Sequence, residues 1–321
     1  MMTLHTKVLS LIDGRQTFKK RKKLIEWLMK KELLQGKMKC KLCKKRMKLE
    51  KHSNVDGLQW KCRRKKHRGK TTKKSVRSLS LFQRSKLSLF SWMKYIYRFS
   101  QGLQLRQIDL LQDGVAGSSR TLSKISLKLR KVCKSAIKRR ERRGKQRLGG
   151  PNEFVMLDES NFYHKRKYGR GRFGPTWRRR KCVFGMLGIR GKRRRPILRL
   201  VKQRSRRHLI PLVTKYVRQG TTVITDMWRA YTTVIAESGF VHFSVNHSRS
   251  FVNPDTGAHT QNIERAWSTY KSQVWRLRGN RTVKTLKSHL AFIEWTHWLA
   301  NEHKDGPLGR LLHDIRHFCK F

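Results

Sequence analysis

The chain has 321 residues and a formal net charge of +60, from 79 Lys and Arg against 19 Asp and Glu. No apolar run approaches the roughly 20 residues that cross a bilayer, and the N-terminus lacks the apolar core of a secretory signal, so we expect no membrane partner. Such a charge repels itself unless a polyanion neutralises it, which favours nucleic acid as the partner, although a ribosomal-type protein satisfies the charge equally well.

A basic helix is expected near the N-terminus, over 19–35, within a first region spanning 1–80. The run of Lys and Arg at 19–23 has the composition of a nuclear import signal, as does the run at 138–147. The predicted location is therefore the nucleus in a eukaryote, and the cytoplasm or nucleoid in a bacterium. A solvated or DNA-facing helix start explains the first run equally well.

A zinc-ribbon-like module is predicted in the rest of this first region. Two cysteines with the spacing of a metal-binding knuckle precede a predicted hairpin, and a second, looser pair follows it; the four candidate ligands are Cys40, Cys43, Cys62 and His67. Four protein ligands leave no open position, so the zinc would be structural. The alternative is a hairpin with incidental thiols, in which His67 belongs to a basic loop.

The region 84–137 is expected to be helical, with two helices, a glycine-rich turn at 113–117 and a long third helix. This order is typical of a helix-turn-helix, and we predict that Arg120 and Lys124 on the third helix contact DNA. A plain helical bundle has the same pattern. Residues 138–150 are charged, end in two glycines and are predicted to form a basic linker.

Strands and helices alternate in 151–303, which is followed by a tail at 304–321. The expected strands are 153–159, 181–190, 196–202, 221–226 and 240–246; the expected helices are 206–218, 228–238 and one that carries Glu264. A three-stranded meander followed by alternating helices and strands is the order of an RNase H-like α/β domain, a mixed sheet with flanking helices.

Three carboxylates of that domain suit a site for divalent cations. Asp158 and Asp226 each close an apolar strand, and Glu264 lies on a later helix. Phosphodiester cleavage or transesterification uses two Mg²⁺ ions about 4 Å apart, held by carboxylate oxygens, with Asp158 as the candidate bridging ligand. Other interpretations stay open, because Glu159 lies on the opposite strand face, Asp226 suits a helix cap, and Glu264 suits a surface partner of a neighbouring basic residue.

Basic residues around these acids are candidates for phosphate contact. Lys271 lies at i+7 from Glu264, hence on the same helix face, although a solvent-facing lysine is the alternative. The loop 164–181 interleaves basic residues with aromatic ones, a composition that suits phosphate contact and stacking on unpaired bases. Its predicted DNA contacts are Lys165, Arg170, Arg172, Arg178 and Arg179. The alternative is a basic hairpin with no defined ligand.

Several strings in 153–303 together resemble the Merlin-type DNA transposases, relatives of bacterial insertion-sequence transposases with a DDE core. The strings are the apolar strand ending in Asp158-Glu-Ser, the run Thr222-Val-Ile-Thr-Asp226-Met-Trp-Arg-Ala-Tyr231, the pair His242 and His247, and His259-Thr-Gln-Asn-Ile-Glu264-Arg-Ala-Trp267-Ser-Thr-Tyr-Lys271. The zinc ribbon and the helical region also stand where this family carries them.

The resemblance implies that Asp158, Asp226 and Glu264 are the DDE residues and that Lys271 is the trailing lysine of the motif. It implies a cut-and-paste transposase that uses Mg²⁺ or Mn²⁺, two ions per site, and binds terminal inverted repeats and target DNA as a homodimer or larger assembly. Two alternatives remain: a domesticated, non-catalytic DNA-binding protein on the same fold, and an RNase H-like, structure-specific nuclease.

Overall fold

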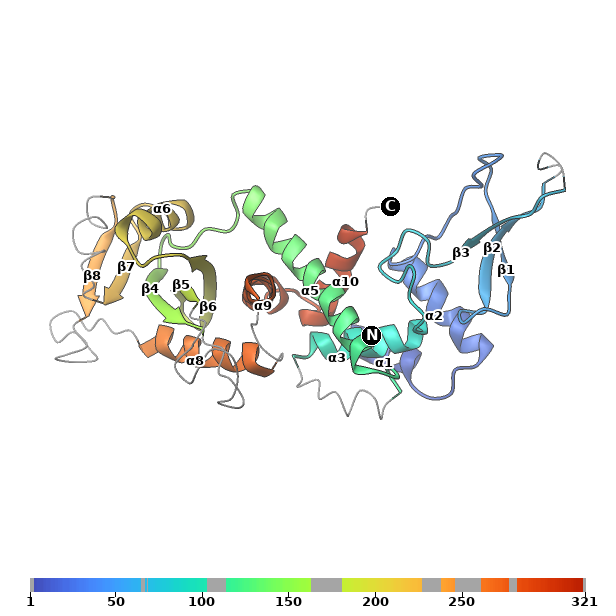
Figure 1. Ribbon diagram of the computed structural model, residues 1–321, viewed down its shortest axis with the longest axis horizontal. Coiled ribbons are helices and arrows are strands. Elements are labelled where there is room, and N and C mark those ends of the chain that lie inside the picture. Colours follow the sequence, from blue (N-terminus) through green and yellow to red (C-terminus); the bar gives the residue numbers. More distant parts are fainter. Residues whose placement is uncertain are drawn as a thin grey trace, which may run out of the picture. The chain divides into compact units, whose positions relative to one another are not determined.

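The structure is a computed structural model, and it describes residues 3–64, 67, 69–102, 114–162, 181–226, 238–245, 261–276 and 282–319. The chain divides into two compact units, one formed by Met1–Cys133 with Ala300–Phe321 and the other by Lys134–Leu299 (Figure 1). Of the helices in the described ranges, none combines the length and apolar character that crossing a membrane requires.

The first unit is built mainly from helices. They are α1 (Leu4–Ile12), α2 (Phe18–Lys30), α3 (Leu89–Ser100), the first part of α5 (Ser119–Arg142) and α10 (Gly306–Phe318). Threonine or serine caps the N-terminus of the first three, accepting a backbone N–H in the first turn: Thr3 from Thr6, Thr17 from Lys20 and Ser88 from Ser91. Helix α3 contacts α1, α2 and α10, and its buried Trp92 and Tyr95 lie in the core of the unit.

A small antiparallel sheet accompanies these helices, in the order β1-β2-β3, from β1 (Lys48–Lys51), β2 (Leu58–Cys62) and β3 (Thr72–Ser75). The first two strands form the hairpin expected between the two pairs of zinc ligands. The third strand was not expected from the sequence, since its residues Thr-Lys-Lys-Ser lack an apolar alternation. Just after it, Arg77 and Asp56 form a buried ion pair with distances of 2.5 and 2.6 Å.

The predicted helix-turn-helix lies partly outside the described residues. Helix α3 and the long helix α5 are present, but the residues between them, 103–113, are outside the description, so the motif stays a prediction. Helix α5 buries an apolar stripe that includes Leu122 and Leu129, and it leaves Arg120 and Lys124 exposed. The segment predicted as a linker, 138–150, begins as the last turn of this helix, and Leu148 within it is buried.

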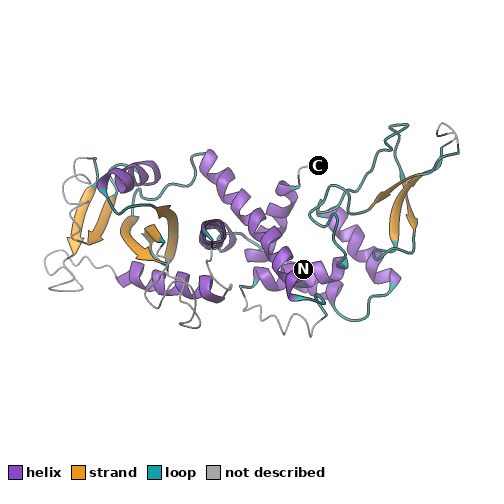
Figure 2. Ribbon diagram, in the orientation of Figure 1, coloured by secondary structure: helices purple, strands orange, loops and turns teal. Residues whose placement is uncertain are grey.

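The described residues of the second unit form a sheet of five strands (Figure 2). The strands are β4 (Phe154–Asn161), β5 (Cys182–Arg190), β6 (Arg193–Val201), β7 (Thr222–Asp226) and β8 (Val241–Val245), in the order β6-β5-β4-β7-β8. The first three are antiparallel neighbours, whereas β7 is parallel to β4 and β8 is parallel to β7. A meander of three strands extended by two parallel strands is the RNase H-like order, so the predicted fold class is confirmed.

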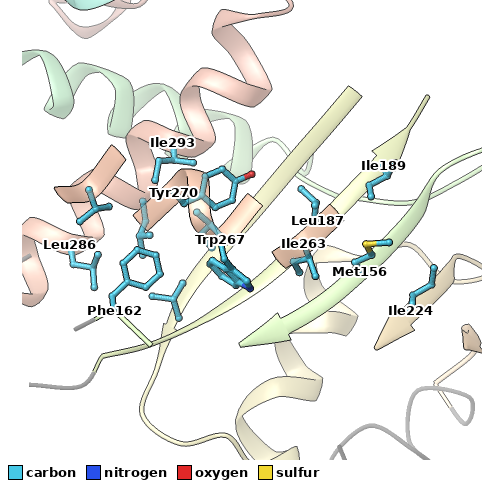
Figure 3. Packing of buried hydrophobic residues seen from close by; sticks show 14 of the residues in the cluster. Met156, Phe162, Leu187, Ile189, Ile224, Ile263, Trp267, Tyr270, Leu286 and Ile293 are labelled. Carbon is cyan, nitrogen blue, oxygen red and sulfur yellow. The ribbon is translucent and has the colours of Figure 1, made fainter. Parts of the chain in front are cut away.

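Helices cover this sheet. Buried side chains of α8 (Gln261–Arg276) and α9 (Val283–Trp295) pack with Met156 of β4, Leu187 of β5 and Ile224 of β7 in one apolar cluster (Figure 3). The short π-helix η2 (Thr296–Ala300) continues α9. Helix α6 (Arg206–Tyr216) contacts β6 and buries its own apolar side chains. Because side chains alternate along a strand, the even-numbered residues of β4 and β7 face the cluster under α8.

A buried glutamate joins several elements of this unit. Glu294 of α9 is 1% exposed and accepts hydrogen bonds from the Gln146 side chain, the Leu198 backbone N–H and the Arg199 guanidinium, at 2.7, 2.7 and 2.5 Å. Arg199 also donates to the hydroxyl of Tyr216 at 3.0 Å. Burial raises the pKa of Glu294, and Arg199 acts in the opposite direction. The carboxylate is therefore kept in the interior by a charged partner and two neutral donors.

Arg199→Met should lower the free energy of unfolding by about 3 kcal/mol, because it leaves Glu294 without its charged partner. Lys22→Met is the control, since it removes only the ion pair with Glu26, in which both side chains are 57% exposed; its expected effect is below about 1 kcal/mol. Urea unfolding followed by tryptophan fluorescence measures both. Equal unfolding midpoints for the two variants would contradict the assigned role of the Glu294 network.

Candidate functional site

Two aspartates come together on the face of the sheet that α8 covers. Strands β4 and β7 pair in parallel with Val155 opposite Val223 and Met156 opposite Ile224. Continuing that register brings Asp158 beside Asp226, with both side chains on the face of Met156 and Ile224. Burial raises the pKa of Asp158, and the charge of Asp226 raises it further. The two carboxylates thus lie close enough to repel each other.

The Asp158 carboxylate is held by two neutral donors. Its Oδ2 accepts the indole N–H of Trp267 on α8 at 2.8 Å, and its Oδ1 accepts the backbone N–H of Glu159 at 2.7 Å. Both hydrogen bonds lower the pKa of Asp158, against the larger effect of burial. Oxygen ligands and adjacent like charges fit a hard divalent cation, since a cation relieves the repulsion between these two acids.

Glu159 has a different environment, which separates it from Asp158. Its carboxylate is 1% exposed and binds Arg204 at 2.7 Å, on the opposite face of the strand. Burial raises the pKa of Glu159 to about 7, although Arg204 acts in the opposite direction. The geometry therefore places Asp158, and not Glu159, beside Asp226 under α8.

Glu264 and Lys271 lie on the first and third turns of α8. The helix buries Ile263, Trp267 and Tyr270 against the sheet, while Glu264 is exposed and Lys271 is partly buried. Glu264 precedes Trp267 by three residues, about 4.5 Å along the helix axis, so it stands next to the residue that contacts Asp158. Among the described residues, however, the three carboxylates do not form a group that could hold a metal ion as the cysteine and histidine cluster does.

The predicted DNA contacts are distributed over different parts of the chain. Five of them lie on the loop outside the described residues: Lys165, Arg170, Arg172, Arg178 and Arg179. The helix expected at 228–238, which Asp226 would cap, also lies outside them. Arg120 and Lys124 are exposed on the first turns of α5, in the first unit. Lys271 alone of this group lies on the helix that carries Glu264.

A second candidate site is the cluster of Cys40, Cys43, Cys62 and His67, whose ligand atoms all lie within 4.8 Å of one another. The Sγ atoms of Cys43 and Cys62 are 3.7 Å apart, and Nε2 of His67 lies 3.5 Å from the Sγ of Cys40 and 3.8 Å from that of Cys62. Tetrahedral zinc, with Zn–S near 2.3 Å and Zn–N near 2.0 Å, requires separations of about 3.8 and 3.6 Å. The four residues fit a structural zinc ion.

The knuckle around Cys40 also favours the thiolate that binds metal. Burial raises the pKa of Cys40, but hydrogen bonds from the backbone of Cys43 and Leu42 and from the side chain of Thr72 lower it to about 6. The turn itself closes through Lys44 N–H to the carbonyl of Cys40 at 3.1 Å and Lys45 N–H to that of Cys43 at 2.7 Å. The sequence spacing of the first cysteine pair therefore does correspond to a metal-binding turn.

The sheet and α8 lie in a segment that is similar to a known family of domains. Residues 148–278 match the family model of the ISXO2-like transposase domain. That segment runs from just before β4 to just after α8, so it contains Asp158, Asp226, Glu264 and Lys271.

One similar solved structure is the simian T-cell lymphotropic virus intasome in complex with the PP2A regulatory subunit B56 gamma, with a TM-score of 0.32 and 14% sequence identity. The match covers 52% of this chain and 56% of that chain, so this chain spans little more than half the length of its structural relative. No curated protein matches. The observed strand order carries the fold assignment.

Sequence reasoning missed two residues that shape the carboxylate site. Arg204 follows β6 and holds Glu159, and nothing in a chain so rich in arginine distinguishes it before the fold is known. The sequence shows Trp267 only as one residue of a motif, and its contact with Asp158 spans 109 positions of the chain. Its place one turn after Glu264 was the available signal.

Cys62→Ser should reduce bound zinc from about one ion per chain to near zero and destabilise the hairpin, because three ligands hold structural zinc poorly. Cys319→Ser is the matched control, since this cysteine lies outside the cluster. Metal analysis of the two purified variants measures the difference. The same zinc content in both would contradict the assignment.

Proposed function

We propose that the chain is a cut-and-paste DNA transposase of the Merlin type, which cleaves DNA at the ends of its element and joins the freed 3′-hydroxyl to target DNA. The observation that carries the proposal is the placement of Asp158 beside Asp226 on one face of the sheet, within the segment that matches the transposase domain. The net charge of +60 supports DNA as the substrate.

Each residue of the candidate site has a separate role in this proposal. Asp158 and Asp226 hold the divalent cations from the sheet, and Glu264 completes the ligand set from α8. Bound Mg²⁺ or Mn²⁺ supplies an activated water or 3′-hydroxyl and relieves the charge on the leaving oxygen. Lys271 lies two helical turns after Glu264 on the same face, where it holds a phosphate of the DNA. Cleavage and joining are both in-line displacements at phosphorus, so one site serves both.

The first unit supplies the recognition of the element's ends in this proposal. The cysteine and histidine cluster stabilises a small sheet, and Arg120 and Lys124 are exposed at the start of α5, where the recognition helix of a helix-turn-helix begins. Two DNA ends have to be held together for one insertion, so the active form is a homodimer or a larger assembly on DNA.

Asp226→Asn should abolish both cleavage and joining while leaving DNA binding intact, because it removes a metal ligand and not a phosphate contact. The measurement uses the full chain, Mg²⁺ or Mn²⁺, and labelled duplexes carrying the DNA that flanks the gene. Asp305→Asn is the control, since this carboxylate belongs to the first unit and should leave activity unchanged. A wild-type chain that binds these ends without cutting them would indicate a non-catalytic DNA-binding protein; cutting without end preference or joining would indicate a nuclease.

Lys271→Met should weaken binding to all DNA sequences alike and reduce the slope of log K against log salt by about 0.9, the value for one phosphate contact. Lys304→Met is the control, because it also removes one positive charge, at a lysine that is not assigned to the DNA interface. Fluorescence anisotropy across a salt series measures the slopes. An unchanged slope for Lys271→Met would show that this lysine does not contact a DNA phosphate.

A further inference from the structure

Trp267 connects the helix that carries Glu264 to the first aspartate of the site. Trp267 is 5% exposed, and its Nε1–H donates to Oδ2 of Asp158 at 2.8 Å. A buried indole N–H needs an acceptor, and here that acceptor is the carboxylate of a proposed metal ligand. Because Oδ1 accepts the Glu159 backbone N–H at 2.7 Å, each oxygen of Asp158 has one fixed donor.

The ring itself has little freedom to move. Gly185 lies opposite Asp158 in the β4–β5 pairing, and a Cβ on this glycine would come within 2.5 and 2.6 Å of two atoms of the indole ring. Phe162 and Tyr270 pack edge-on against the indole, with ring centroids 6.0 and 6.2 Å away (Figure 3). The absence of a side chain at position 185 therefore lets the indole lie directly on the strand, with its N–H edge at Asp158.

We propose that Trp267 is a positioning residue, whose indole N–H fixes the orientation of the Asp158 carboxylate for binding of the divalent cation. A carboxylate oxygen has two lone pairs, so each oxygen of Asp158 keeps one for a cation after accepting its hydrogen bond. Partners of this kind restrict rotation of a ligand before the metal binds, and their loss costs about 10–100-fold in metal affinity or activity. The inference rests on the proposed function, because it assigns Asp158 to the metal site.

A purely structural role is the competing explanation, and the chain offers a matched comparison. Trp298 is also buried, and its indole N–H donates to the backbone carbonyl of Pro196 at 2.6 Å. Trp298→Phe and Trp267→Phe each delete one buried indole donor from the second unit. The two variants differ in the acceptor that is left without its donor: a peptide carbonyl in one and the proposed metal ligand in the other.

The test measures Mn²⁺ binding to the full chain, with electron paramagnetic resonance as the readout. The Mn²⁺ binding that is lost in Asp158→Asn is the binding that belongs to the site. For that binding, Trp267→Phe should raise the dissociation constant at least about tenfold, whereas Trp298→Phe should leave it unchanged and lower only the melting temperature. If Trp267→Phe does not fold, replacement of Trp267 by benzothienylalanine, which has sulfur in place of the ring N–H, tests the same donor with the ring shape kept.

Wild-type affinity for Mn²⁺ in a folded chain without the Trp267 donor would overturn the inference and leave the proposed function standing. Equal losses of Mn²⁺ affinity in the Trp267 and Trp298 variants would overturn the inference too. The loss would then come from a less stable fold and not from the missing donor to Asp158. The absence of any Mn²⁺ binding that depends on Asp158 in the wild type would contradict the proposed function itself.

Discussion

Two acids of a strongly basic chain lie side by side because β4 and β7 pair in parallel. That register pairs Met156 with Ile224 and so brings Asp158 beside Asp226 on the same face of the sheet. A shift of the register by one residue would turn one of them to the other face. The pairing creates electrostatic repulsion, which raises the pKa of Asp158 together with burial. A divalent cation bound between the two carboxylates would relieve this repulsion.

Helix α8 completes the arrangement through its buried stripe. Trp267 and its apolar neighbours pack against the sheet, and Glu264 and Lys271 lie on the adjacent stripe of the helix. Two buried acids elsewhere in the described chain have cationic partners: Glu294 has Arg199, and Asp314 has Arg310 at 2.8 Å. Asp158 instead accepts hydrogen bonds from two neutral donors, an indole and a peptide N–H. This contrast separates acids that stabilise the fold from one suited to hold a metal.

Sequence patterns predicted the five strands and placed Asp226 at the end of one of them, because apolar runs are local features. The expected end at Asp158 was wrong, since β4 continues to Asn161, three residues past this aspartate. The patterns left Asp158 and Glu159 unresolved, because the choice depends on which face α8 covers and on Arg204, far along the chain. They also passed over Glu294, since a single acid in a helix usually indicates a solvated position. The cysteine spacing predicted a ligand set whose geometry the fold reproduces. The contact of Trp267 with Asp158 required the tertiary structure, and the convergence of Glu264 with the two aspartates stays a prediction.

We propose that Asp158, Asp226 and Glu264 share one divalent-cation site. Fe²⁺ in place of Mg²⁺, with ascorbate and peroxide, generates radicals that cut the polypeptide close to the bound ion, and mapping the fragments locates it. A shared site predicts cuts near all three residues, which excess Mg²⁺ suppresses and which are lost in Asp158→Asn. Cuts confined to the cysteine cluster, or unchanged in that variant, would contradict it.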